Sequence, residues 1–75
     1  MDPIINAVLE PKSIAIVGAS ADPEKIGYKV VANLIAGGYE GAIYPINPKA
    51  EEILGHKCYT SVKEVPYVID AAIIT

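Results

Sequence analysis

The stretch SIAIVGASADPEKIGYKVVANLIAGG, residues 13–38, decides the fold. It opens with the segment SIAIV at 13–17, in which every residue after Ser13 is apolar, as is typical of a strand buried on both faces of a parallel sheet. A loop of small and polar residues follows at 18–25. Apolar residues then recur at helical spacing, at Ile26, Val30, Val31, Leu34 and Ile35. Because Gly37 and Gly38 end this pattern, the stretch predicts a strand, a loop and a helix in that order.

The rest of the chain continues the alternation of strands and helices. A second apolar run at 42–46 predicts another strand, although Pro45 weakens that prediction near its end. The last segment, 68–75, resembles the first strand. The remaining segments predict short helices at 3–10 and 49–55, an extended piece at 57–59 and one helical turn at 61–65.

This alternation indicates a Rossmann-like α/β fold of three layers around a mostly parallel sheet. Such a sheet buries its strands only when helices cover both of its faces. No turn signal or helical pattern follows the strand at 70–75. We therefore expect the fold to be truncated after this strand and the chain to be part of a larger α/β protein. A chain of this kind is expected to be marginally stable or to self-associate.

Composition excludes several classes of function. The 75 residues are 52% apolar and carry a formal net charge of -3, with no basic stripe that nucleic acid would require. Cys58 is the only cysteine, which excludes an internal disulfide or a multi-thiolate metal site and favours a cytoplasmic location. No segment approaches the roughly 20 apolar residues that span a bilayer, and the N-terminus lacks signal-peptide features. We therefore expect neither membrane insertion nor secretion.

The loop after the first strand carries the main chemical signal. A strand that ends at Gly18 and leads through a small-residue loop into a helix brings backbone N–H groups and the positive end of the helix dipole together. This arrangement favours phosphate, and Gly18, Ala19, Ser20, Lys25 and Gly27 are the candidate binding residues. The dinucleotide fingerprint would require glycine at position 20, where the sequence has Ser20. No P-loop pattern for ATP occurs either.

A second signal follows the strand at 42–46. Proteins that bind NAD commonly carry an acidic residue there to accept hydrogen bonds from the ribose, whereas this chain has Asn47, Pro48 and Lys49. A lysine favours a ribose that carries its own phosphate, as in NADP or coenzyme A. We therefore take Asn47 and Lys49 as further candidate binding residues, and NAD becomes less favoured.

Three segments together resemble the N-terminal coenzyme A-binding domain of the NDP-forming acyl-CoA synthetases: LEPKSIAIVGASADPEKIGYKVVANLI, GAIYPINPKAEEILGHKCYTSV and VPYVIDAAIIT. This group includes the ADP-forming acetyl-CoA synthetases and is related to the α subunit of succinyl-CoA synthetase. The resemblance covers nearly the whole chain. It implies that residues 1–75 are the N-terminal part of a Rossmann-like coenzyme A-binding domain.

The resemblance also implies a ligand, a reaction and partners. Coenzyme A is the implied cofactor, contacted by the loop matching Gly18 to Gly27 and by the lysine matching Lys49. The family's reaction links acyl-CoA cleavage reversibly to ATP formation from ADP and phosphate, through a phosphorylated histidine in a later domain. The implied partners are coenzyme A or acyl-CoA and the remaining domains or subunit of a synthetase. No catalytic residue is expected within this chain.

Two alternatives stay open. One is an oxidoreductase domain that binds NADP, and the other is a non-catalytic coenzyme A-binding protein, because a single-domain family shares part of the same pattern. His56 has no partner at a spacing that suggests acid–base chemistry, and nothing near Cys58 in the sequence would reliably lower its pKa. Neither residue is assigned a role.

Overall fold

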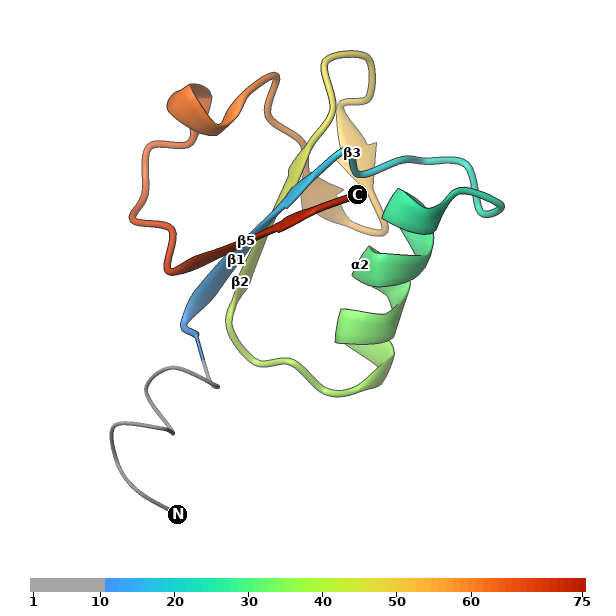
Figure 1. Cartoon of the computed structure of the whole chain (residues 1–75), viewed down its shortest axis with the longest axis horizontal. Helices are drawn as coiled ribbons and strands as arrows, with labels where there is room; N and C mark the ends of the chain where they lie inside the picture. Colours follow the sequence, from blue (N-terminus) through green and yellow to red (C-terminus); the bar gives the residue numbers. More distant parts are fainter. Residues whose placement is uncertain (1–10) are drawn as a thin grey trace.

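The computed structural model describes residues 11–75, so the short helix predicted over 3–10 lies outside the described residues. The described part is a small α/β fold with one α-helix (Figure 1). Its elements, in chain order, are β1 (Ser13–Val17), α2 (Ile26–Ala36), β2 (Ala42–Ile46), β3 (Glu52–Ile53), β4 (His56–Lys57), the 3-10 helix η1 (Val62–Glu64) and β5 (Ala71–Ile74). No helix of the described residues is long and apolar enough to cross a membrane.

Three parallel strands form the main sheet, in the order β2-β1-β5. The central place of β1 explains its continuous apolar sequence, because Ala15 and Ile16 are 0% exposed. The predicted parallel sheet, the strands at 13–17 and 42–46 and the helix between them are confirmed. The last strand is shorter than predicted, since β5 begins only at Ala71.

The residues before β5 are held by a side chain of β1 in place of ladder bonds. The Ser13 hydroxyl donates to the Val68 carbonyl oxygen at 2.8 Å and accepts from the Asp70 N–H at 2.9 Å. The Asp70 carboxylate accepts in turn from the Lys12 N–H at 2.8 Å. Ser13 is therefore buried with its hydrogen bonds satisfied, and the strand starts at Ala71, three residues after the start of the apolar pattern at Val68.

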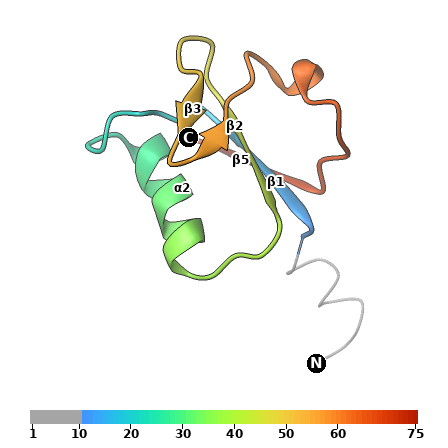
Figure 2. The same ribbon diagram turned by 180° about the vertical axis from the view of Figure 1, so that it is seen from behind.

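The two faces of the sheet are covered differently (Figures 1 and 2). On one face, Val31 of α2 packs against Ile14 and Ile16, and Ile53 extends this cluster. On the other face, Val65 from the segment that contains η1 packs against Ala15 and Ile46. This second face has no α-helix within residues 11–75, and Ile74 there is 81% exposed.

Pro45 lies within β2 without breaking it. β2 is an edge strand of the sheet, and the Pro45 carbonyl oxygen accepts from the Tyr59 N–H at 2.9 Å, on the side away from β1. Since the N–H and C=O of one strand residue point to the same side, the N–H that proline lacks would also have faced outward. The missing donor therefore removes no bond from the ladder with β1.

The helix predicted over 49–55 is wrong. The segment forms the antiparallel pair β3 and β4, with Glu52 opposite Lys57 and Ile53 opposite His56. Leu54 and Gly55 make the turn with φ of 49° and 84°, as a tight hairpin turn requires. Gly55, interpreted from the sequence as a helix stop, is therefore a turn residue. A helix of seven residues is marginal by itself, and burial of Ile53 in the core favours the hairpin.

The extended piece predicted at 57–59 and the helical turn at 61–65 are close to the observed elements. β4 spans His56–Lys57, Tyr59 forms a parallel bridge with Ile46, and η1 occupies Val62–Glu64. The bridge attaches this part of the chain to the outer edge of β2.

We expect Leu54→Asn to raise the free energy of unfolding by roughly 0.5–1 kcal/mol, because asparagine tolerates the left-handed conformation better than leucine. Leu54→Ala is the matched control, since it removes the same apolar side chain without relieving the backbone. Urea unfolding of the two variants measures the effect. An Asn variant no more stable than the Ala variant would show that the turn is not strained.

Candidate functional site

A pocket of about 670 Å³ lies where the carboxyl ends of β1 and β2 meet. This is the edge at which open α/β sheets bind their ligands. All the residues predicted to bind the ligand line it except Gly27. The lining residues are Val17, Gly18, Ala19, Ser20, Lys25, Ile46, Asn47, Pro48, Lys49, Thr60, Ser61 and Val62.

Gly27 has a packing role at the rear of this pocket. A Cβ added to it would lie 2.1 Å from the Gly18 carbonyl oxygen and 2.9 Å from the Ala19 Cα. Only glycine therefore lets the first turn of α2 approach the end of β1 this closely. Gly18 has a φ of +88°, which also favours glycine.

The carbonyl groups at the end of β1 and just after it accept hydrogen bonds from other parts of the fold. The Val17 carbonyl oxygen accepts from the Thr75 N–H at 3.0 Å, and the Ala19 carbonyl oxygen accepts from the Asn47 Nδ2 at 2.9 Å. The Thr75 hydroxyl also donates toward the carbonyl oxygens of Val17 and Gly18, each at 3.1 Å. The donors in these bonds partly offset the negative partial charge of the carbonyl oxygens, which would otherwise oppose an anion in the pocket.

The N-terminus of α2 supplies the opposite charge. The helix starts at Ile26 after Lys25, with no side-chain cap and no acidic residue in its first turn. The N–H groups of the first turn of an α-helix have no partner within the helix, and together with the helix dipole they attract anions. The Ser20 hydroxyl accepts from the Asp22 N–H at 3.0 Å, which leaves its own O–H available as a donor.

Asn47 holds the end of β2 in place. Its Oδ1 accepts from the Lys49 N–H at 2.7 Å and the Ala50 N–H at 3.2 Å, while its Nδ2 binds the loop after β1. The side chain therefore joins the two loops that form the pocket and fixes the backbone of Lys49. This geometry favours a positioning role for Asn47 over a direct contact with the ligand.

The pocket is positive although the chain is acidic overall. Lys25 and Lys49 line it, and no Asp or Glu is among its lining residues, whereas the whole chain has a net charge of -3. Two mobile ammonium groups beside an uncapped helix N-terminus fit the phosphate groups of a nucleotide cofactor.

Sequence reasoning missed Thr60, Ser61 and Val62 as lining residues. They reach the pocket because Tyr59 bonds to the outer edge of β2, through its N–H to Pro45 and its carbonyl to the Asn47 N–H at 2.9 Å. This pairing joins residues more than ten positions apart and leaves no local pattern in the sequence.

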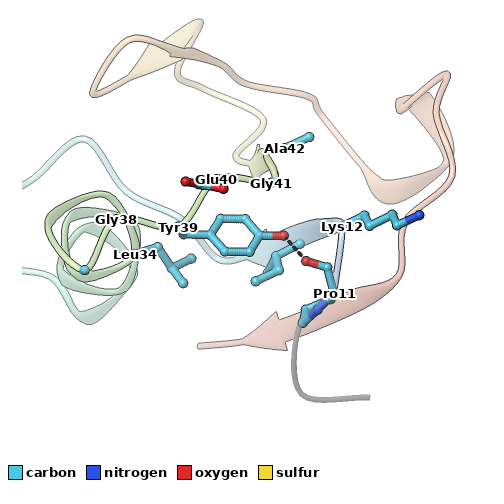
Figure 3. A pocket seen from close by; sticks show the side chains of 10 residues that line it. Pro11, Lys12, Leu34, Gly38, Tyr39, Glu40, Gly41 and Ala42 are labelled. Atoms are coloured by element: carbon cyan, nitrogen blue, oxygen red, sulfur yellow. Dashed lines mark hydrogen bonds between the residues drawn. The ribbon is translucent and has the colours of Figure 1, made fainter. Parts of the chain in front are cut away.

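A second pocket of about 900 Å³ lies at the opposite end of the sheet, between the end of α2 and the start of β1 (Figure 3). The Tyr39 hydroxyl donates to the Pro11 carbonyl oxygen at 2.6 Å across it. Burial, and next the nearby Asp70 carboxylate, raise the pKa of Tyr39. Lys12 and Glu40 both line this pocket, so its charges are mixed. It also lies away from the carboxyl ends of the strands, and we do not take it as the candidate site.

Cys58 has the properties of a core residue. Its side chain is buried beside Ile53 in the cluster under α2. Burial, and next the Glu52 carboxylate, raise the pKa of the Cys58 thiol, so it is not an activated nucleophile.

Residues 12–75 match the family described as a CoA binding domain. The chain is 50% identical over 74 residues to the α subunit of the ADP-forming acetate–CoA ligase I of Pyrococcus furiosus, covering 93% of this chain and 16% of the relative. It matches the apo structure of the dinucleotide forming acetyl-coenzyme A synthetase 1 of Ca. Korarchaeum cryptofilum with a TM-score of 0.89 and 46% identity, covering 95% of this chain and 16% of that chain.

A shorter structure also matches. The chain is 42% identical to a hypothetical protein from Pyrococcus horikoshii OT3, with a TM-score of 0.78. The match covers 95% of this chain and 49% of the hypothetical protein. The chain therefore spans a small part of the two ligase relatives and about half of the shorter protein.

We expect Gly27→Ala to lower the free energy of unfolding by about 1–3 kcal/mol, because a methyl group cannot fit against the Gly18 carbonyl. The sign is diagnostic, since alanine in an ordinary helical position would stabilise by about 1 kcal/mol over glycine. Urea unfolding is the measurement. Asn33→Ala, at an exposed position of the same helix, is the control and should be neutral or slightly stabilising. A stabilised Gly27→Ala variant would contradict the close packing of α2 on β1.

The raised pKa of Cys58 predicts slow alkylation. The rate with iodoacetamide should keep rising above pH 9.0, the ordinary pKa of the thiol, because the thiolate forms only at higher pH in the folded chain. The same chain in urea is the control and should react faster at each pH. A folded-state rate that levels off at or below pH 9.0 would contradict the burial of the thiol.

Proposed function

The chain belongs to the CoA binding domain family, and on this premise we propose that it binds coenzyme A in the pocket at the carboxyl ends of β1 and β2. The observation that carries the proposal is the coincidence of that pocket with an uncapped helix N-terminus and two lysines, without any lining carboxylate. Coenzyme A carries three phosphate groups, so its negative charge suits a pocket lined by two lysines and by no carboxylate.

The diphosphate of coenzyme A is assigned to the loop between β1 and α2. Ser20 contributes its backbone N–H and its hydroxyl, and Lys25 contributes a mobile charge beside the first turn of α2. Gly18 and Ala19 line the same loop, in which the Ala19 N–H donates to the Ile16 carbonyl oxygen at 3.3 Å. Gly27 and Asn47 shape this loop, through close packing and through the bond to Ala19.

The 3′-phosphate is assigned to Lys49. This lysine follows β2, at the position where an acidic residue would bind the unphosphorylated ribose of NAD. A cation there favours a phosphorylated ribose, which coenzyme A and NADP share. The family match favours coenzyme A over NADP.

The relatives support a place for this module within an ADP-forming acyl-CoA synthetase, where coenzyme A is a substrate. The reaction converts an acid, coenzyme A and ATP reversibly into acyl-CoA, ADP and phosphate. The module anchors the phosphates of coenzyme A so that its thiol reaches chemistry carried out by other domains or a partner subunit. None of the residues assigned above acts as a catalytic group.

A second candidate is a non-catalytic coenzyme A-binding protein. The hypothetical protein of about twice this length supports it, because the fold also occurs there outside a chain of synthetase size. Both candidates use the same pocket in the same way.

We expect Lys49→Ala to weaken coenzyme A binding about tenfold, or about 1.4 kcal/mol, because a charge-assisted contact to the 3′-phosphate is lost. Calorimetric titration with coenzyme A and 3′-dephospho coenzyme A measures the effect. The affinity for the dephospho form should be unchanged, so the preference for coenzyme A should disappear.

Lys63→Ala is the matched control, since Lys63 is exposed and lies outside the pocket. It should bind both ligands as the unchanged protein does. Equal weakening of both ligands by Lys49→Ala would contradict the assignment of Lys49, and tighter binding of NADP than of coenzyme A would contradict the proposed function itself.

A further inference from the structure

The loop after β1 is held by side chains that follow both of its neighbouring strands. Asn47 follows β2, and its Nδ2 donates to the Ala19 carbonyl oxygen at 2.9 Å. Thr75 follows β5, and its hydroxyl lies 3.1 Å from the Gly18 carbonyl oxygen. Because β2 and β5 lie on opposite sides of β1, two consecutive carbonyl groups of the loop are held from the two sides of the central strand.

The pairing of β5 with β1 determines where the Thr75 side chain lies. The Thr75 N–H donates to the Val17 carbonyl oxygen at 3.0 Å, which extends the parallel pairing by one residue beyond Ile74. The hydroxyl has one proton to share between the carbonyl oxygens of Val17 and Gly18, each at 3.1 Å. Thr75 is exposed and is not among the residues that line the pocket. Its side chain therefore contacts the loop and not the space assigned to the ligand.

The peptide group between Gly18 and Ala19 has only one other hydrogen bond to fix its direction. Gly18 has no Cβ and a φ of +88°, and glycine adopts several backbone conformations at similar free energy. The Ala19 N–H donates to the Ile16 carbonyl oxygen at 3.3 Å, which is long for such a bond. The bond from the Thr75 hydroxyl is the shorter of the two.

The direction of the Gly18 carbonyl is important for an anion. Gly18 and Ala19 both line the pocket. A carbonyl oxygen turned toward the pocket would place negative partial charge beside the diphosphate assigned to this loop and would oppose its binding. In the observed direction, the oxygen accepts from the Thr75 hydroxyl and packs closely against Gly27 of α2.

We propose that Thr75 is a positioning residue for coenzyme A, because its hydroxyl holds the Gly18 carbonyl in a direction that leaves the loop able to bind the diphosphate. This inference rests on the proposed function, since it concerns the loop that binds the same ligand. It extends the site to the end of β5, a strand that contributes no lining residue to the pocket. The role requires the hydroxyl itself and not only the branched shape of the side chain.

Thr75→Val and Thr75→Ser separate the hydroxyl from the shape of the side chain. Valine keeps the branched shape without the hydroxyl, and serine keeps the hydroxyl without the methyl group. Calorimetric titration would use coenzyme A and 3′-dephospho coenzyme A. We expect Thr75→Val to bind both ligands about three- to tenfold more weakly, as loss of one hydrogen bond implies. Thr75→Ser should bind both ligands within about twofold of the unchanged protein.

The ratio of the two affinities should be the same in Thr75→Val as in the unchanged protein. Both ligands carry the diphosphate, and they differ only in the 3′-phosphate that is assigned to Lys49. Thr75→Ala is a second variant without the hydroxyl and should bind as weakly as Thr75→Val. Circular dichroism would verify that each variant folds.

A role in packing alone predicts the opposite order of the variants, because serine lacks the methyl group that valine keeps. Binding weakened more by Thr75→Ser than by Thr75→Val, or unchanged binding by Thr75→Val, would overturn the positioning role while the proposed function stands. A loss of the preference for coenzyme A over its dephospho form in Thr75→Val would also overturn it. Failure of the unchanged protein to bind coenzyme A would instead overturn the proposed function.

Discussion

The close approach of the α2 N-terminus to the end of β1 is the contact on which the candidate site depends. Gly27 permits it, since any Cβ there would lie 2.1 Å from the Gly18 carbonyl oxygen. The contact aims the free N–H groups of the first helical turn at the carboxyl edge of the sheet. The same packing buries Val31 against Ile14 and Ile16, so the core and the anion site are built by one helix placement.

Hydrogen bonds between distant parts of the chain complete the site. Asn47 joins the loop after β2 to the loop after β1, and Thr75 holds the carbonyl groups at the end of β1. Tyr59 attaches the segment that carries Thr60 and Val62 to β2. The bonds from Asn47 and Thr75 occupy backbone carbonyl oxygens beside the pocket, and the bonds of Tyr59 place further residues in its lining. The charge of the pocket is then set by N–H groups and lysines.

Local sequence patterns predicted β1, α2 and β2 because each has its own periodicity and a clear end signal, such as Gly37 after the helix. They failed for β3 and for the turn after it, since the hairpin requires Leu54 in a left-handed conformation that leucine rarely adopts. They placed six candidate residues around one pocket, because parallel strands bring their carboxyl ends together. They missed Thr60, Ser61 and Val62, whose position depends on the pairing of Tyr59 with Ile46.

The most direct test of the account is to map coenzyme A onto the folded chain by NMR, following the backbone amide signals during a titration. The largest shifts should occur at Gly18, Ser20, Gly27 and Lys49, around the pocket at the carboxyl edge. The amides near Tyr39, at the other end of the sheet, should stay unchanged. Shifts concentrated near Tyr39, with the loop before α2 unaffected, would contradict the claim that this loop and Lys49 hold the ligand.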